Sequence, residues 1–382
     1  MHPVFANLPT TVFEVMSRLA REHDAINLGQ GFPDDPGPED VRQKAAEAVV
    51  SGWNQYPPMM GLPELRAAVA KHYAHWQGAT LDPESEIMVT SGATEALTGA
   101  ILTLIEPGDE VVLFQPLYDS YLPMVKRAGG IPKLVRLEPP HWRITEDALR
   151  KVFTKKTKAV LFNNPHNPAG IVYSIDDLKL LARFCIESDA VAICDEVWEH
   201  VVFDGRRHVS MLSVPGMRER TVKIGSAGKI FCLTGWKVGF VCAAPALMRG
   251  LSKAHQFITF TTPPNLQSAV AYGLGKTDDY FLNMRKDLAR SRDRFANGLR
   301  KLGFDPLESQ GTYFMNVDLA ALGINEADHD FCHRLVTENK VAAIPVSAFY
   351  AEDAVTSVVR FCFAKRDSTL DGALERLAAL AR

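Results

Sequence analysis

Several features that would place this chain in a specialised class of protein are absent or scarce. Its 42 basic and 45 acidic residues leave a formal net charge of −3, and no long basic run occurs. This balance argues against a dedicated surface for nucleic acid or anionic membranes. Internal repeats are absent, and no uncharged apolar run approaches the roughly 18 residues that cross a membrane. We therefore expect neither nucleic acid nor membrane among the partners.

Cysteine is also sparse, with six residues in 382 and no Cys-x-x-Cys pair. Reduced, buried thiols in a cytosolic protein are the simplest interpretation. The first 24 residues contain neither an apolar core nor a small-residue cleavage site, so they predict no signal peptide. Together these features predict a cytoplasmic protein.

Short β-rich runs alternate with helical patterns through the middle of the chain. Ser174 and Asp177 form an approximate capping box at the start of one amphipathic helix. Near-continuous apolar strands separated by helices predict an α/β fold with a mostly parallel sheet covered on both faces. Helices are predicted at about 93–105 and 118–127, and strands at 86–90, 110–115, 132–137, 159–163, 191–195, 222–225 and 238–243.

The pattern changes from about Pro263 onward. Two long helical segments reach Leu302, and strands follow near 313–318, 341–344 and 358–363 before a helix over 368–380. This order predicts a smaller α+β domain. We expect an N-terminal arm over 1–39 that packs with the small domain, a large domain over 40–275 and the small domain over 276–382.

A lysine in a loop of small residues is the first candidate for chemistry. Lys229 follows Gly228, but Lys223 and Ile230 occupy positions where a phosphate-binding P-loop needs glycine and serine or threonine. The P-loop interpretation therefore fails. The apolar residues after Lys229 would desolvate it, which lowers the pKa of a lysine and suits an amine nucleophile. A surface lysine after a turn is the alternative.

Two further candidates lie at strand ends, where open α/β sheets bind ligands. Asp195 ends an apolar strand, and a buried carboxylate there needs a cationic partner such as a protonated pyridine nitrogen. A helix cap is an equally good interpretation of Asp195. The strand–turn–helix passage over 89–96 leaves backbone N–H groups free to bind a phosphate, although such turns are common.

An asparagine loop and a buried arginine complete the set. Two Asn-Pro steps around Asn167 predict either a rigid loop that aims an amide at a ligand or an ordinary turn. Arg360 lies inside the apolar run 358–363, where burial is costly without an anion. A carboxylate ligand would satisfy it with two hydrogen bonds, and an internal salt bridge is the alternative.

The order and combination of these segments resemble the fold-type I, pyridoxal-phosphate-dependent aminotransferases of class I and II over nearly the whole chain. The branch with methionine aminotransferases, kynurenine aminotransferases and glutamine transaminase K is especially similar. The resemblance implies a three-layer sandwich with a mostly parallel seven-stranded sheet, a smaller α+β domain, pyridoxal 5'-phosphate as cofactor and a homodimer with shared active sites. The matching stretches are 27–34 (NLGQGFPD), 54–56 (NQY), 195–197 (DEV), 235–239 (GWKVG) and 343–347 (AIPVS).

The resemblance also implies roles for individual residues. Lys229 would be the catalytic residue, which bonds to the cofactor and then moves a proton between the substrate Cα and the cofactor C4′. Asp195 would keep the pyridine nitrogen protonated, Tyr118 would stack on the ring, and Asn167 would hydrogen-bond the phenolic oxygen. The phosphate would be bound by Ala93, Thr94, Ser226, Lys237 and the partner subunit's Tyr56. The substrate would be bound by Gly31, Asn167, Arg360 and Phe13.

One position departs from the family pattern. Relatives usually have tyrosine three residues after the cofactor-binding aspartate, and this chain has Trp198. An indole N–H can donate a hydrogen bond but never ionises, so Trp198 would contact the cofactor differently.

Histidines offer little further chemistry. His329 and His333 stand four residues apart on a predicted helix, a spacing that zinc sites use, but no third ligand accompanies them. We therefore expect no metal. His166 either lines the site beside Asn167 or occupies a turn.

The residues and the resemblance together predict an aminotransferase. It would move the α-amino group of an L-amino acid with a large neutral side chain (methionine, glutamine, an aromatic residue or kynurenine) to a 2-oxo acid by a ping-pong mechanism. The same scaffold also allows a cysteine-S-conjugate β-lyase. A non-catalytic, aminotransferase-like ligand-binding module is the alternative from a different class.

Overall fold

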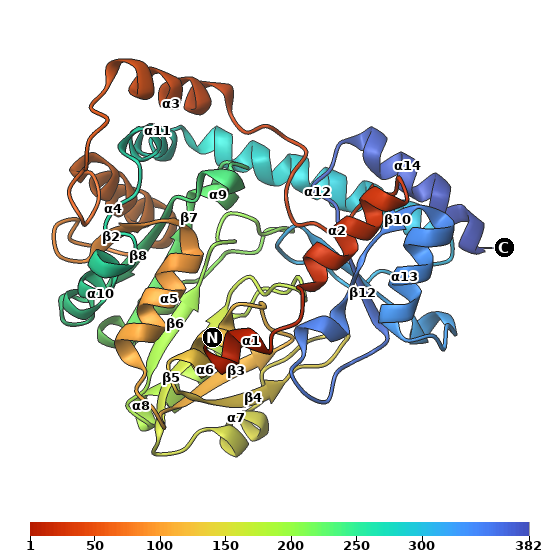
Figure 1. The fold of residues 1–382 in the computed structure, drawn as a ribbon, viewed down its shortest axis with the longest axis horizontal. Coiled ribbons are helices and arrows are strands. Elements are labelled where there is room, and N and C mark those ends of the chain that lie inside the picture. The colour runs from red at the N-terminus through yellow and green to blue at the C-terminus, as the bar shows by residue number, and fades with distance from the viewer. Residues whose placement is uncertain (382) are drawn as a thin grey trace.

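A seven-stranded sheet forms the centre of the molecule, and the computed structural model describes residues 1–381 (Figure 1). The strand order is β2–β8–β7–β6–β5–β3–β4. All neighbours pair in parallel except β8, which is antiparallel to both β7 and β2. The predicted, mostly parallel sheet is therefore confirmed. Its strands are β2 (Ile87–Thr90), β3 (Glu110–Gln115), β4 (Ile131–Arg136), β5 (Thr157–Asn163), β6 (Val191–Asp195), β7 (Thr221–Ser226) and β8 (Gly239–Ala243).

Helices cover both faces of this sheet. Alternate residues of each strand point to opposite faces, so each strand contributes apolar side chains to both. On β5, Val160 and Phe162 belong to the apolar cluster that contains Leu178 of α8, whereas Ala159 and Leu161 belong to the cluster that contains Ile101 of α5. The result is the expected three-layer α/β sandwich. The helices that follow or precede these strands are α3 (Glu39–Ser51), α4 (Pro63–Gln77), α5 (Gly92–Leu104), α6 (Tyr121–Arg127), α7 (Glu146–Val152), α8 (Ile175–Glu187), α9 (Ala227–Ile230), α10 (Pro245–Ile258) and α11 (Pro264–Leu274).

Local sequence signals place several element ends. The predicted capping box is present at α8: Asp177 N–H donates to Ser174 Oγ at 3.2 Å, and Ser174 N–H donates to Asp177 Oδ2 at 2.8 Å. The helix expected from residue 118 begins at Tyr121, because the chain first turns through Leu117–Ser120. The rings of Tyr118 and Tyr121 lie close together, with 5.7 Å between their centres.

The C-terminal part contains a three-stranded antiparallel sheet of order β11–β12–β9. The single strand expected at 341–344 is wrong: Ala343 divides it into β10 and β11, which belong to different sheets. The terminal helix ends at Leu377 rather than 380, and a 3₁₀ turn follows. The elements are α12 (Asp278–Lys301), β9 (Phe314–Asp318), α13 (Asp328–Asn339), β10 (Val341–Ala342), β11 (Ile344–Pro345), β12 (Val358–Cys362) and α14 (Asp367–Leu377).

The N-terminal segment lies against this C-terminal part. It contains α1 (Pro3–Ala6), α2 (Val12–Glu22) and β1 (Ile26–Asn27), and β1 pairs in parallel with β10. Figure 1 shows α2 beside β10 and α14. The two ends of the chain thus share one small two-stranded sheet. The three-part division at residues 39 and 275 stays a prediction.

Two further properties of the fold concern membrane spans and cysteines. Within residues 1–381, no helix is both long and apolar enough to span a membrane. All six cysteines are free thiols, and all but Cys232 are buried.

Candidate active site

The carboxyl ends of β5, β6 and β7 meet at one cavity of about 150 Å³. Asn163, Asp195 and Ser226 are the last residues of these strands, and all three line the cavity. Parallel pairing brings them to the same edge of the sheet, as the strand-end argument requires. Of the predicted cofactor residues, those that line this cavity are Ala93, Thr94, Tyr118, Asn167, Asp195, Trp198, Ser226, Lys229 and Lys237.

A larger groove of about 1080 Å³ lies elsewhere, between the loop at 33–38 and α12. It shares no lining residue with the smaller cavity. Two of its acidic groups are already neutralised, since Asp34 pairs with Lys365 at 3.4 Å and Asp367 with Arg290 at 2.7 Å. We assign the chemistry to the smaller cavity, which holds the lysine and the carboxylate at the strand ends.

Lys229 reaches the cavity from the short helix α9, directly after β7. Its Nζ lies 4.6 Å from the centre of the Trp198 ring. Tyr313 fixes the backbone at this point, because its hydroxyl donates to the Lys229 carbonyl at 3.0 Å. Burial lowers the pKa of Lys229 to about 8. About a tenth of this amine is therefore neutral, and nucleophilic, at pH 7, a far larger share than at the ordinary lysine pKa of about 10.4.

Asp195 is buried and held by two donors. Tyr121 Oη donates to Asp195 Oδ2 at 2.7 Å, and Val197 N–H donates to Asp195 Oδ1 at 3.4 Å. Burial raises the pKa of Asp195 because the charged form is desolvated. Within residues 1–381, no lysine, arginine or histidine nitrogen lies within 4.0 Å of this carboxylate. A cationic ring nitrogen on a ligand would supply the missing charge.

Arg360 is almost completely buried and also lacks an acidic partner among residues 1–381. Its Nη1 donates to Asn167 Oδ1 at 2.8 Å, its Nη2 donates to Gly29 O at 3.1 Å, and its Nε has no partner among the described residues. The guanidinium carbon lies 3.8 Å from the centre of the Phe314 ring and 5.0 Å from that of Phe349. Burial lowers the pKa of Arg360 to about 9. Arg360 does not itself line the strand-end cavity, but its partner Asn167 does, and a ligand carboxylate would supply the anion that the guanidinium lacks among the described residues.

The start of α5 provides an anion site. Ser91 makes no side-chain capping bond, so it leaves first-turn N–H groups of α5 free for a ligand. Lys237 Nζ donates to Thr94 Oγ1 at 3.4 Å and adds positive charge beside the first turn of α5. A Cβ at Gly239 would lie 2.7 Å from the Gly92 carbonyl carbon, so glycine allows β8 to pack directly behind this turn.

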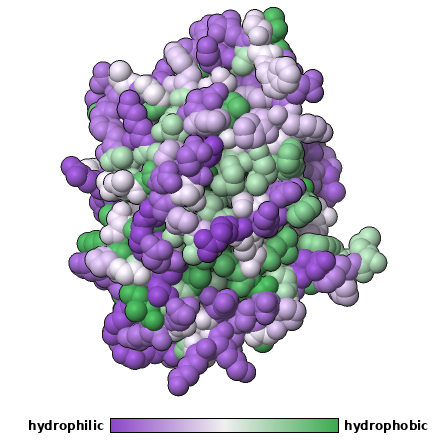
Figure 2. All heavy atoms as spheres, turned by 90° about the vertical axis from the view of Figure 1, so that its left-hand side faces the viewer, coloured by the Kyte–Doolittle hydropathy of each residue, from purple (hydrophilic) through white to green (hydrophobic). Residues whose placement is uncertain are grey.

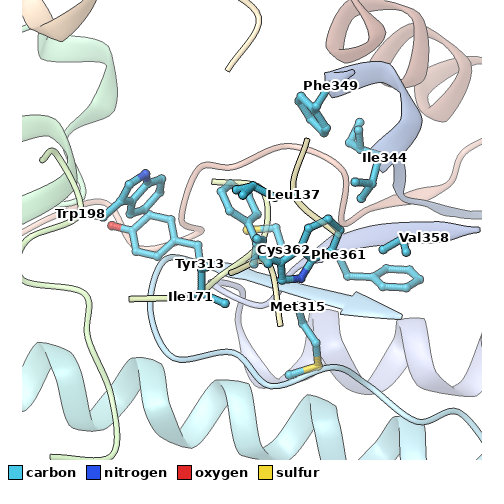
Figure 3. Packing of buried hydrophobic residues seen from close by; sticks show 14 of the residues in the cluster. Leu137, Ile171, Trp198, Tyr313, Met315, Ile344, Phe349, Val358, Phe361 and Cys362 are labelled. Carbon is cyan, nitrogen blue, oxygen red and sulfur yellow. The ribbon is translucent and has the colours of Figure 1, made fainter. Parts of the chain in front are cut away.

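Trp198 occupies the position at which the family pattern has tyrosine. It is buried, and its ring lies 4.5 Å edge-on from the ring of Tyr313 (Figure 3). Its indole lines the cavity, and Lys229 Nζ lies over the ring.

Not every predicted residue reaches the cavity. Tyr56 is 80% exposed on a loop, with its ring 5.6 Å from that of Phe260, and does not line the cavity of its own chain. Gly31 lies against Phe314, whose ring a Cβ at Gly31 would meet at 2.6 Å. Phe13 packs 5.7 Å from Phe349 and 5.5 Å from the Arg360 guanidinium. Gly31 and Phe13 thus surround Arg360 rather than the strand-end cavity.

Sequence reasoning missed Asn163, which lines the cavity, and Tyr121, which contacts Asp195 from outside the lining. Asn163 could have been found, because it is a polar residue at the end of an apolar strand. Tyr121 carries no local signal: its partner Asp195 is 74 residues away in sequence. His166, for which the sequence allowed a place in the site or in a turn, is fully buried and does not line the cavity. Burial lowers its pKa to about 3.

A buried charge cluster lies directly behind the site. Lys223 Nζ is 3.0 Å from Glu196 and 2.6 Å from Glu199, and Tyr73 Oη donates to Glu199 at 3.0 Å. Burial favours the neutral amine, but the two carboxylates outweigh this effect and raise the pKa of Lys223. Glu196, Glu199 and His208 are spaced as metal ligands, yet the Lys223 ammonium already pairs with both carboxylates. The cluster anchors the segment that carries Asp195 and Trp198.

The chain was compared with known proteins. The family described as aminotransferase class I and II matches residues 23–377. A probable N-succinyldiaminopimelate aminotransferase from Mycobacterium tuberculosis is 43% identical over 97% of this chain and 96% of its own. The methionine aminotransferase of Escherichia coli is 41% identical over 98% and 96%, and human kynurenine–oxoglutarate transaminase 1 is 37% identical over 94% and 93%.

Solved structures give the same result. The structure of the Mycobacterium tuberculosis N-succinyldiaminopimelate aminotransferase superposes with a TM-score of 0.96 at 43% identity and covers 100% of both chains. The structure of an Escherichia coli protein with methionine aminotransferase function has a TM-score of 0.96 at 40% identity and covers 99% of both.

The tight packing behind α5 predicts a selective effect of Gly239→Ala. The new methyl group would push β8 away from Gly92 and Ala93, at a cost of about 1–3 kcal/mol for overpacking. Binding of pyridoxal phosphate should weaken, as measured by titration of the apoprotein. Gly235→Ala is the matched control, because its Cβ would meet no atom within 4 Å. Equal affinities for the two variants would contradict the assignment of the phosphate to this turn.

The lowered pKa of Lys229 predicts a pH profile. Only the neutral amine attacks an aldehyde, so the rate at which the apoprotein attaches pyridoxal phosphate should rise through about pH 8 and then level off. Stopped-flow absorbance measures this rate, and Lys229→Arg should abolish the reaction. A rate that keeps rising to the ordinary lysine pKa of about 10.4 would show that Lys229 is not desolvated.

Proposed function

The chain belongs to the aminotransferase class I and II family, whose members depend on pyridoxal phosphate, and we propose that it transfers the α-amino group of large neutral L-amino acids to a 2-oxo acid. That it is an aminotransferase follows from the family and its relatives. The relatives do not favour a carbon–sulfur lyase or a non-catalytic binding module. The single observation that supports the substrate class is Arg360, a buried guanidinium without an acidic partner among the described residues, next to phenyl rings.

The residues present fit pyridoxal phosphate. The Asp195 carboxylate has no cationic partner among the described residues, so it suits a protonated ring nitrogen. The start of α5, together with Lys237, suits a phosphate. Between these two points Tyr118 lines the cavity and offers a ring face. When bound, the cofactor supplies an aldehyde that takes up the amino group and a ring that withdraws electrons.

The chain's own residues would divide the remaining work. Lys229 Nζ is poised, by its lowered pKa, to hold the cofactor and to accept the proton of the substrate Cα. Arg360 would bind the α-carboxylate through its free Nε and its Nη groups. Asn167 already orients the Arg360 guanidinium, and it would also bind the phenolic oxygen of the cofactor.

The surroundings of Arg360 support a neutral side chain on the substrate. Phe13, Phe314 and Phe349 lie about the guanidinium. Among the residues that line the cavity, Lys229 and Lys237 are the cations, and both are already assigned. A second carboxylate on the substrate would therefore lack a partner.

The chain would act as a homodimer in which each active site includes the partner subunit's Tyr56. Large apolar side chains are exposed on α3, in the loop after it, on α10 and the turn that follows, and on α11. Figure 2 shows apolar patches on the side of the molecule where Figure 1 places these helices. An exposed apolar face of this kind is typical of a subunit interface. Its exposed members are Val49, Val50, Trp53, Tyr56, Phe257, Ile258, Phe260 and Tyr272.

We also propose a cytoplasmic enzyme, which the free thiols support. The large domain at 40–275 would bind the cofactor, and the small domain at 276–382, with the arm at 1–39, would bring Arg360 to it. The hydrogen bond from Arg360 on β12 to Asn167 supports this arrangement.

The substrate proposal predicts a two-step spectral experiment. Methionine alone should remove the visible absorbance of the cofactor-loaded protein, because the amino group passes to the cofactor. A 2-oxo acid should then restore the absorbance. N-succinyl-diaminopimelate and glutamate are the acidic comparison donors, and we expect methionine, glutamine or kynurenine to react at least about tenfold faster, a difference of about 1.4 kcal/mol.

Two outcomes would contradict the proposal. A faster reaction with an acidic donor would show that another group binds a distal carboxylate. Release of ammonia and a 2-oxo acid while the absorbance persists without an acceptor would show that elimination is the main reaction, because elimination leaves no amino group on the cofactor.

The shared site predicts complementation between two defective variants. In a mixed dimer of Lys229→Ala and Tyr56→Ala, one site combines an intact lysine with an intact tyrosine from the other chain. Activity should therefore recover after the two variants are unfolded and refolded together. A mixture of Lys229→Ala and Asp195→Asn is the control, since both residues belong to one chain's cavity. If the first mixture recovers no more activity than the control, Tyr56 does not reach the partner's site.

A further inference from the structure

We propose that Tyr121 is a positioning residue for the cofactor: its hydroxyl holds Asp195 as an oriented carboxylate toward the pyridine nitrogen. The inference rests on the proposed function, because it assumes that Asp195 faces that nitrogen. Tyr121 would act through Asp195 rather than by touching the cofactor. It is not among the residues that line the cavity.

The geometry of the pair is well defined. Tyr121 is the first residue of α6, and Asp195 is the last residue of β6. Both side chains are buried, at 2% and 6% exposure, and Tyr121 Oη lies 2.7 Å from Asp195 Oδ2. This distance is that of a strong hydrogen bond to a charged acceptor.

The same tyrosine also supports the ring that faces the cavity. Tyr121 packs edge-on against Tyr118, with 5.7 Å between the ring centres. Tyr118 lines the cavity, and Tyr121 does not. Tyr121 therefore contacts both Tyr118, which would stack on the cofactor ring, and Asp195, which would bind the ring nitrogen.

The hydrogen bond determines which oxygen remains available. Tyr121 occupies Oδ2, while Oδ1 has only the longer bond from Val197 N–H at 3.4 Å. A carboxylate oxygen accepts more than one hydrogen bond, so Oδ1 retains capacity for a ring nitrogen. Without the hydroxyl, the carboxylate would lose the partner that fixes its rotation.

The charged state of Asp195 depends on the same contact. The groups that act on it are Tyr121 from α6, Lys229 from α9, the neighbouring Glu196 and the Val197 N–H. Burial raises the pKa of Asp195, and the Tyr121 hydroxyl opposes this effect most among the contacts. Burial also holds the pKa of Tyr121 far above its usual range, so the hydroxyl stays a donor at any pH of interest.

The chain contains a matched control for this inference. Tyr173 is also 2% exposed, but its hydroxyl has no hydrogen-bond partner among the described residues. Tyr173→Phe therefore removes the same atom from an equally buried ring without touching Asp195. Any effect of losing a buried hydroxyl in general would be common to Tyr121→Phe and Tyr173→Phe.

The test measures cofactor affinity with two ligands. Apoprotein variants are titrated with pyridoxal phosphate and with its 1-deaza analogue, in which carbon replaces the ring nitrogen. Tyr121→Phe should weaken pyridoxal phosphate binding about 10- to 100-fold, the range expected for a hydrogen bond to a charged group. The loss should grow as the pH falls, because Asp195 then gains a proton more readily. Binding of the deaza analogue should be unchanged.

A second measurement separates positioning from a folding defect. In the Asp195→Asn background, Tyr121→Phe should have no further effect on pyridoxal phosphate affinity, since the charge it supports is gone. Circular dichroism of all variants should match that of the natural protein.

Each remaining outcome has one meaning. If Tyr121→Phe binds pyridoxal phosphate as tightly as Tyr173→Phe does, or loses affinity equally for both ligands, the positioning role is wrong. Additive losses from Tyr121→Phe and Asp195→Asn would also overturn it. If the natural protein itself does not bind pyridoxal phosphate, the proposed function fails, and this result is distinguishable from the others.

Discussion

Burial of charge without a full set of partners is the physical constraint on which this site depends. Lys229, Asp195 and Arg360 are all desolvated, and burial shifts the pKa of each toward its neutral form. Fully buried ionisable groups are normally paired, because an isolated buried charge is costly. Here the protein supplies mainly neutral donors and acceptors: Tyr121 for Asp195, and Asn167 and Gly29 for Arg360. A ring nitrogen, an aldehyde and a carboxylate on ligands would complete the set.

The rest of the fold keeps these groups in place. The parallel strands β5, β6 and β7 end at one edge, and the buried Lys223 cluster fixes the segment that follows Asp195. Gly239 lets β8 approach the start of α5 closely, which fixes the turn that would bind the phosphate. Arg360 lies on a different sheet and contacts the site through Asn167, so its position depends on how the C-terminal part packs on the larger one.

Much of this arrangement could be predicted from sequence because its signals are local. Asp195 ends an apolar strand, Lys229 follows small residues, and Ser174 with Asp177 marks a helix start. Tyr121 could not be predicted, since nothing near it in sequence indicates a contact with Asp195, 74 residues away. The division of 341–344 into β10 and β11 was also not predicted, because the two halves of one short apolar run pair in different sheets. Tyr56 lies on the surface of its own chain, so a single chain cannot test its assignment.

The proposed function depends most on Lys229, the desolvated amine that would take up the cofactor. The most direct measurement is peptide mapping by mass spectrometry after borohydride reduction of the protein with bound pyridoxal phosphate. We expect the phosphopyridoxyl group on Lys229 alone. A label on Lys237, Lys223 or exposed lysines, with Lys229 unmodified, would contradict it.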